Sequence, residues 1–221
     1  MFPLSSEPPA PPSSQASTTH AHFDLSTVVS HSYTSLREAA NEIILLYTKT
    51  QKLSISSNHP QGFMNRTSWL PQSTPLLSLP RSQWDKNQLI PYIRLGTWVD
   101  LVINNLDDGS HPFHLHGYSF YVLAWHRSEH GWGSYNPYST RGASAVKPVL
   151  NLESPVRKDT VSVPRRGYVV LRFKADNEGI WMLHCHVLFH QGSGMAMGVH
   201  VGNDEAHEEV DLGAKELCAL E

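Results

Sequence analysis

Short runs of β-branched and aromatic residues recur along the chain from Glu42 onward, separated by Gly, Pro, Asn and Asp. They read EIILLYT, TWVDLVIN, YSFYVLAW, DTVSV, GYVVLRFKA, GIWMLHCHV and GMAMGVHV. Runs of this length bounded by turn-forming residues are typical of β-strands, and a series of them predicts a sandwich or a barrel. The chain is therefore expected to be all-β over most of its length.

The segments on either side of this series lack its pattern. Residues 1–33 are rich in Pro, Ser and Thr and poor in bulky apolar side chains, which predicts a flexible arm. Residues 34–203 form the predicted β domain, and residues 204–221 form a polar, acidic tail. Two segments are helix candidates, SLREAANE at 35–42 and AKELCALE at the end of the tail.

Composition excludes several classes of partner. The net charge of -3 leaves no electrostatic footprint for nucleic acid or for an anionic membrane surface. No stretch of about twenty apolar residues exists, so no membrane span is expected. The first residues, Met1 to Ser14, lack the basic start and the apolar run of a secretory signal, so no signal peptide is expected in this chain.

Histidine is the over-represented residue, with 14 copies against two cysteines. Six of the 14 fall in two short windows, HPFHLH at 111–116 and HCHVLFH at 184–190. Side chains alternate faces along a strand, so His184 and His186 are expected to point one way and Cys185 the other. One strand can thus serve two metal sites placed back to back.

The first predicted site contains Cys185, His190 and His111, with Met195 ten residues beyond the cysteine. A thiolate, two imidazoles and a weak thioether are the ligands of a blue-copper electron-transfer site. Zinc is the alternative, although structural zinc sites take four strong ligands and exclude methionine. Copper is therefore the expected metal.

The second predicted site contains four imidazoles and no thiolate, those of His114, His116, His184 and His186. Such a set suits copper, zinc, iron or nickel. Its covalent link to Cys185 gives a short route for electrons between a one-electron site and a polynuclear one. The remaining histidines, among them His20 and His22 in the arm, are expected to bind no metal.

These motifs resemble those of the multicopper oxidases, in particular the C-terminal cupredoxin domain of laccase-like members. HPFHLHG at 111–117 resembles the third copper-binding motif of the family, and HCHVLFHQGSGM at 184–195 resembles the fourth. NRTSW, VRKDTVSVP and VVLRFKADNEGIWMLHCH resemble the neighbouring strands, so the resemblance covers about 40–203. It implies a Greek-key, cupredoxin-like β-sandwich.

The resemblance also assigns roles to the candidate ligands. His111, Cys185 and His190 would bind the type 1 copper, with Met195 in the axial place. His114 would bind the type 2 copper. The type 3 pair would be bound by His116, His184 and His186. Substrate electrons would enter through the His190 imidazole and pass along Cys185 to the trinuclear cluster, where O2 is reduced to water.

The chain departs from the family pattern in several ways. The family cluster uses eight histidines, and the domains that supply the other four, in HWH and HSH motifs, are missing from this chain. Leu188 stands where many members carry an acidic residue. Cys218 has no partner here, whereas a late cysteine in laccases often pairs with one in the first domain. The sequon at Asn65 would carry a glycan only in an exported protein.

The expected function is therefore one-electron oxidation of phenolic or similar donors coupled to O2 reduction, by a fragment of a longer secreted oxidase. Two alternatives are a stand-alone blue-copper electron-transfer module and an inactive fragment that cannot retain copper. Ferrous iron is the alternative donor, although the acidic residues that a ferroxidase needs could not be placed from the sequence.

Overall fold

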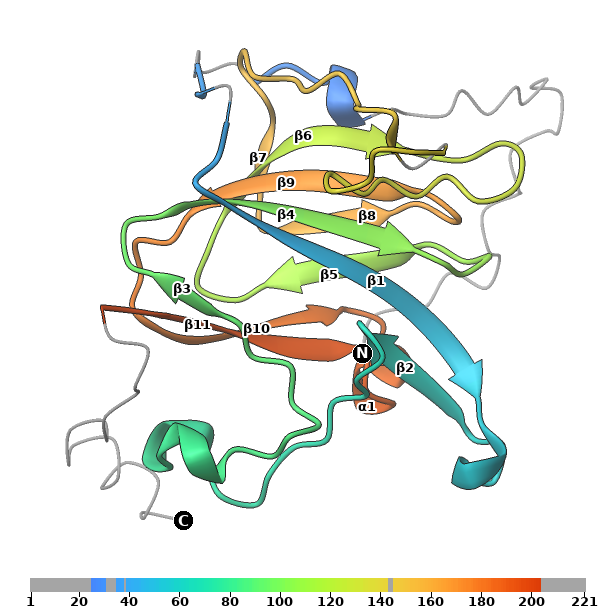
Figure 1. Cartoon of the computed structure of the whole chain (residues 1–221), viewed down its shortest axis with the longest axis vertical. Helices are drawn as coiled ribbons and strands as arrows, with labels where there is room; N and C mark the ends of the chain where they lie inside the picture. Colours follow the sequence, from blue (N-terminus) through green and yellow to red (C-terminus); the bar gives the residue numbers. More distant parts are fainter. Residues whose placement is uncertain (1–24, 31–34, 38, 143–144, 204–221) are drawn as a thin grey trace, which may run out of the picture.

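A computed structural model describes residues 25–30, 35–37, 39–142 and 145–203. Within these residues the chain is nearly all β and forms two facing sheets (Figure 1). The six-stranded sheet has the order β2 (Pro60–Met64), β1 (Glu42–Lys52), β4 (Trp98–Asn105), β9 (Tyr168–Lys174), β6 (Phe120–His126) and β7 (Arg157–Lys158). The five-stranded sheet has the order β3 (Tyr92–Arg94), β11 (Ala196–Gly202), β10 (Gly179–Cys185), β5 (His111–Leu115) and β8 (Thr160–Val163).

Successive strands cross repeatedly from one sheet to the other, as β4, β5 and β6 do. The pairs β1–β4 and β3–β11 are parallel, and the other pairs are antiparallel. Each of the seven apolar runs identified in the sequence contains a strand. The prediction of an all-β, cupredoxin-like sandwich is confirmed.

The core lies between the two sheets and contains fully buried aromatic and aliphatic side chains, such as Phe113, Phe120 and Phe173. Burying each such side chain stabilises the fold by roughly 1.5–3 kcal/mol. Val102 and Val170 point to the opposite face of the six-stranded sheet, because neighbours in a strand alternate. There they form a second, smaller cluster with Leu123, Ala124 and Tyr168.

The prediction of a helix over residues 35–42 is wrong. Ser35 forms an isolated β-bridge with Glu153, the backbone N–H of Leu36 donates to Leu152, and Glu42 already belongs to β1. These groups bond to neighbouring segments instead of to carbonyls one turn earlier in a helix. A window of eight residues has too little helical stability of its own to resist such pairing. The second helix candidate and the rest of the tail, 204–221, lie outside the described residues.

Part of the predicted N-terminal arm, residues 25–30, belongs to the described structure. It begins with a 3-10 turn, Leu25–Thr27, and Val29 forms a bridge with Pro155. The helical elements in the described ranges are short, and none is long and apolar enough to cross a membrane. The α-helix α1 (Leu188–Gly192) follows β10 and lies beside β2 (Figure 1).

Candidate metal centre

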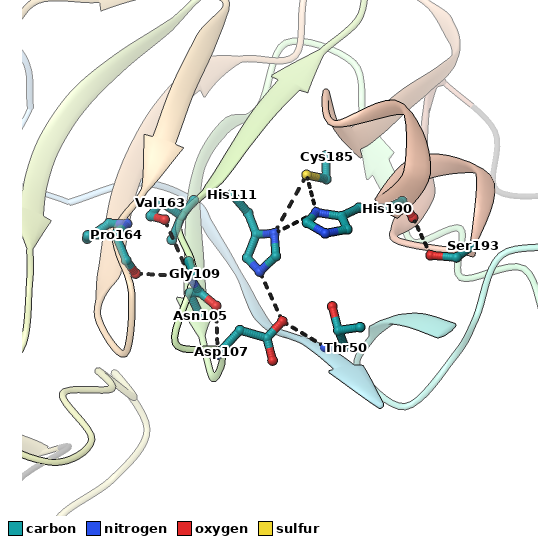
Figure 2. Close-up of polar contacts among 10 residues, drawn as sticks. All are labelled: Thr50, Asn105, Asp107, Gly109, His111, Val163, Pro164, Cys185, His190 and Ser193. Carbon is teal, nitrogen blue, oxygen red and sulfur yellow. Dashed lines mark hydrogen bonds and ion pairs between the residues drawn. The ribbon is translucent and has the colours of Figure 1, made fainter. Parts of the chain in front are cut away.

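Three predicted ligands converge at one end of the sandwich (Figure 2). Cys185 ends β10 and is fully buried, His111 begins β5, and His190 lies in α1. The Cys185 Sγ atom is 3.7 Å from His111 Nδ1 and 3.5 Å from His190 Nδ1, and the two nitrogens are 3.1 Å apart. In the described part of the chain, no other group of three potential ligands is as tightly gathered.

These separations fit a bound metal ion. Nitrogen and sulfur atoms that lie about 2.0–2.3 Å from one metal are separated from one another by roughly 3.3–3.7 Å at tetrahedral to trigonal angles. The two sulfur–nitrogen distances, 3.5 and 3.7 Å, fall in this range, and the nitrogen–nitrogen distance of 3.1 Å is slightly shorter. With one thiol and two imidazoles, the donor set suits copper. The residues present therefore fit the copper site that the sequence predicts.

His111 is oriented by a carboxylate that the sequence analysis missed. The Nε2 atom of His111 lies 3.0 Å from Asp107 Oδ2, and the same oxygen accepts a hydrogen bond from the Thr50 backbone N–H at 2.8 Å (Figure 2). A proton on Nε2 donates to the carboxylate and leaves the Nδ1 lone pair directed toward Cys185. The available signal was an acidic residue four positions before His111, in the turn LDDGS.

Burial and hydrogen bonds set the protonation of the groups around this site. Burial raises the pKa of the Cys185 thiol, and burial together with the neighbouring His111 lowers the pKa of His190. For Asp107, burial alone would raise the carboxyl pKa, but hydrogen bonds from His111 and Thr50 hold it below its usual value. A metal ion must therefore displace a proton from Cys185, while the His190 imidazole is already neutral.

Met195 is fully buried, and its backbone is hydrogen-bonded to two of the candidate ligands. Its N–H donates to the His190 carbonyl at 2.9 Å, and its carbonyl accepts from the Cys185 N–H at 3.0 Å. The backbone of the residue predicted for the axial place is thus held against those of Cys185 and His190.

The other four predicted ligands gather on the opposite face of the five-stranded sheet. His184 is directly paired with His114 across β10 and β5, whereas Cys185 is paired with Phe113. The ring of His186 stacks on that of His184, with centroids 5.6 Å apart, and the Nε2 atoms of His116 and His184 are 3.0 Å apart. The alternation of Cys185 with its two histidine neighbours follows the prediction from strand geometry.

Backbone carbonyls select the tautomers of this second group. The Nδ1 atom of His184 lies 3.0 Å from the Cys185 carbonyl, and that of His114 lies 3.0 Å from the Asp159 carbonyl. Protonated Nδ1 atoms donate to these oxygens and leave the Nε2 lone pairs available to a metal. Burial lowers the pKa of His116 and of His184, which keeps both imidazoles neutral.

Other residues singled out in the sequence have different surroundings. Met197 is a core residue, and Leu188 is 82% exposed. Asn65 of the sequon bonds to β1 through its side-chain amide, donating to the Leu45 carbonyl and accepting from the Tyr47 N–H. His20, His22 and Cys218 lie outside the described residues.

Comparison with known proteins agrees with this geometry. A sequence model of the family described as multicopper oxidase matches residues 48–205. Laccase-9 of Arabidopsis thaliana is 40% identical over 127 residues, which are 56% of this chain and 20% of that protein. Oxidoreductase OpS5 of Beauveria bassiana is 32% identical over 194 residues, 81% of this chain and 30% of that protein. Iron transport multicopper oxidase FET3 of Gibberella zeae is 45% identical over 98 residues, 44% of this chain and 14% of that protein.

The chain spans less than a third of the length of each of these three relatives. Among solved structures, Fet3p, a multicopper oxidase that functions in iron import, matches with a TM-score of 0.68 at 23% identity, over 86% of this chain and 37% of that one. The laccase from Botrytis aclada matches with a TM-score of 0.66 at 22% identity, over 97% of this chain and 39% of that one. These structures share the fold, and the family match covers well over half of the chain, so the protein belongs to the multicopper oxidase family.

Proposed function

We propose that this chain is the copper-binding, C-terminal cupredoxin domain of a laccase-like multicopper oxidase. The whole oxidase would oxidise phenolic donors by one electron at a time and reduce O2 to water. In this proposal His111, Cys185 and His190 hold a type 1 copper with Met195 in the axial place. His114, His116, His184 and His186 supply half of the ligands of a trinuclear cluster, and other cupredoxin domains supply the rest.

One observation carries the proposal: a tightly gathered thiol and two imidazoles lie on one face of the five-stranded sheet, directly behind a group of four histidines on its other face. The Cys185 side chain belongs to the first site, and its sequence neighbours His184 and His186 belong to the second. The covalent path between the sites is therefore as short as a polypeptide allows. A domain that merely stored copper has no use for such a link.

Copper bound at the first site would supply reversible one-electron chemistry. The protein contributes a buried thiol, two imidazoles and a carboxylate that fixes the tautomer of His111. The imidazole of His190 is less buried than that of His111. His190 lies in the short helix α1, two residues after the exposed Leu188. It is therefore the better placed of the two to meet an electron donor at the surface.

Copper titration of the purified chain tests the proposal. We expect an intense blue absorption from thiolate-to-copper charge transfer at one equivalent of copper in the first site. O2 uptake with a phenol should require addition of the domains that carry the other cluster ligands. Absence of the blue band would refute the type 1 assignment.

A blue chain that gains no oxidase activity with those domains would support the alternative of a stand-alone electron-transfer module. One observation favours that alternative, because the first site is complete within this chain. Among the described residues, His111, Cys185 and His190 form a group whose ligand atoms all lie within 4.8 Å of one another and could hold a metal ion.

Ferrous iron is the alternative donor, and the position of Asp107 supports it. This carboxylate contacts the His111 imidazole and keeps a lowered pKa, so it is charged near neutral pH and could attract a ferrous ion. Steady-state rates of the complete oxidase with ferrous iron and with a phenol distinguish the two donors. If Asp107→Asn lowers the rate with ferrous iron much more than the rate with the phenol, iron is the substrate.

A further inference from the structure

A strap formed by residues 62–69, the second half of β2 and the turn after it, lies against the loop that carries Met195. The N–H of Gly62 donates to the Ser193 carbonyl at 2.9 Å, and the N–H of Trp69 donates to the Gly194 carbonyl at 3.0 Å. The Ser68 hydroxyl donates to the same Ser193 carbonyl at 3.2 Å. Three hydrogen bonds thus fasten the strap to the loop across more than a hundred residues of sequence.

The strap and the loop also approach so closely that two glycines are required. A Cβ atom on Gly62 would lie 2.6 Å from the Met195 Cβ and 2.7 Å from the Met195 backbone nitrogen. A Cβ atom on Gly194 would lie 2.1 Å from the Ser68 Oγ, and Gly194 has a φ of +111° that favours glycine. The strap therefore limits the positions that the Met195 backbone can take.

The same loop is hydrogen-bonded to two of the candidate ligands, so a limit on its position also limits theirs. Met195 donates to the His190 carbonyl and accepts from the Cys185 N–H, and the Ser193 hydroxyl donates to the His190 carbonyl at 3.1 Å (Figure 2). Residues around a metal site that orient its ligands commonly tune both affinity and potential. In blue-copper sites the axial ligand is one of the main determinants of the potential.

We propose that the strap is a positioning element of the metal centre, in which Gly62 and Ser68 fix the place of the Met195 side chain. Gly62 supplies the space for close approach, and Ser68 holds the Ser193 carbonyl. This inference rests on the proposed type 1 copper site and adds two residues that do not touch the metal. Their effect is on the spectrum and the potential of the copper.

The test compares Gly62→Ala with Gly192→Ala in the copper-loaded full chain. Gly192 lies in the Met195 loop region, at the end of α1, but nothing lies within 4 Å of a Cβ added there. We expect Gly62→Ala to shift the visible absorption, the electron paramagnetic resonance spectrum and the reduction potential toward the values of Met195→Leu. Gly192→Ala should leave all three unchanged. Equal effects of the two variants, or no effect of Gly62→Ala, would overturn the inference.

Two further variants keep the test decisive if Gly62→Ala folds poorly. Ser68→Ala removes only the hydrogen bond to the Ser193 carbonyl and should give a smaller shift in the same direction. In a Met195→Leu background, Ser68→Ala should no longer move the potential, because the thioether through which it acts is gone. A shift that persists in that background contradicts the positioning role. A missing blue band in the unchanged chain instead refutes the copper site itself.

Discussion

The two faces of β10 carry two histidine-rich sites that differ in completeness. On the inner face, Cys185 meets His111 and His190 in the buried core, and every strong ligand expected there comes from this chain. On the outer face, His184 and His186 lie with His114 and His116 on a sheet surface where His186 is exposed. The first site is closed by the sandwich itself, whereas the second is partly exposed.

This difference follows from where each side chain points. Inner-face residues are surrounded by the opposite sheet, by α1 and by the Met195 loop, so ligands from distant segments can converge on one point. On the outer face, the four imidazoles lie side by side, with ring centroids 4.8–6.0 Å apart, and that of His186 is exposed. In the proposed oxidase, ligands from another domain would complete the cluster on this face, whereas single copper ions would bind to the imidazoles of this chain alone.

Replacing Cys185 by Ser should have the largest effect on this comparison. The serine hydroxyl fits the same space and can bond to His111 or His190, so the fold should persist, but it cannot replace a thiolate as a copper ligand. We expect complete loss of the blue absorption, while copper bound at the outer face stays detectable by electron paramagnetic resonance. A blue band that survives this change would show that the inner face does not hold the type 1 copper.

His186→Ala is the reciprocal change on the outer face. The imidazole is exposed and stacks on His184, so its removal should leave the core and the blue absorption unchanged. Loss of a direct ligand should weaken copper binding at the outer face by about 10-fold or more, since even residues behind the ligands contribute this much. Equilibrium dialysis against a copper chelator measures the affinity. Loss of the blue band in this variant would contradict the independence of the two faces.

Asp107→Asn should have a smaller effect, confined to the inner face. The amide oxygen can still accept from His111, but the negative charge beside the imidazole is lost, so copper affinity at this site should fall by about 10-fold. Asp108→Asn is the matched control, because Asp108 is mostly exposed, pairs with Arg166 and makes no contact with His111 among the described residues. Equal losses of affinity in the two variants would rule out a specific role for Asp107.

The sequence predicted well those features that depend on neighbouring residues. Strand positions followed from short apolar runs and turn residues, and the opposite directions of Cys185 and His184 followed from strand alternation. The helix expected at 35–42 was wrong because pairing with Leu152 and Glu153, far along the chain, overrides a weak local preference.

Contacts between distant segments could not be predicted in this way. Asp107 was not recognised, because its role depends on the Thr50 N–H, 57 residues earlier, as well as on His111. The hydrogen bond from Ser68 to Ser193 spans 125 residues, and no local pattern marks it. The candidate ligands were conspicuous in the sequence, but the residues that hold them in place were not.

Tyr118 offers the smallest and most local test, because it anchors the turn that follows His116 on the outer face. Its hydroxyl donates to the Asn177 carbonyl and accepts from the Asn177 N–H at 3.1 Å, and its ring packs against Phe173 and Trp181. Tyr118→Phe should lower the free energy of unfolding by about 1 kcal/mol, since exposed Asn177 can bond to water instead. Denaturant titration measures this loss, and the blue absorption should not change.

The effect of Tyr118→Phe should also depend on pH in a defined direction. Burial raises the pKa of Tyr118 from 10.0 to about 12, so the folded state holds the phenol proton more tightly than the unfolded state does. The unchanged chain should therefore lose stability as the pH rises from about 10 to about 12, whereas phenylalanine has no proton to lose. The stability difference between the two chains should shrink over this interval. A difference that stays constant would mean that the pKa of Tyr118 is the same in the folded and unfolded states, and would contradict burial of the hydroxyl beside the turn that presents His116.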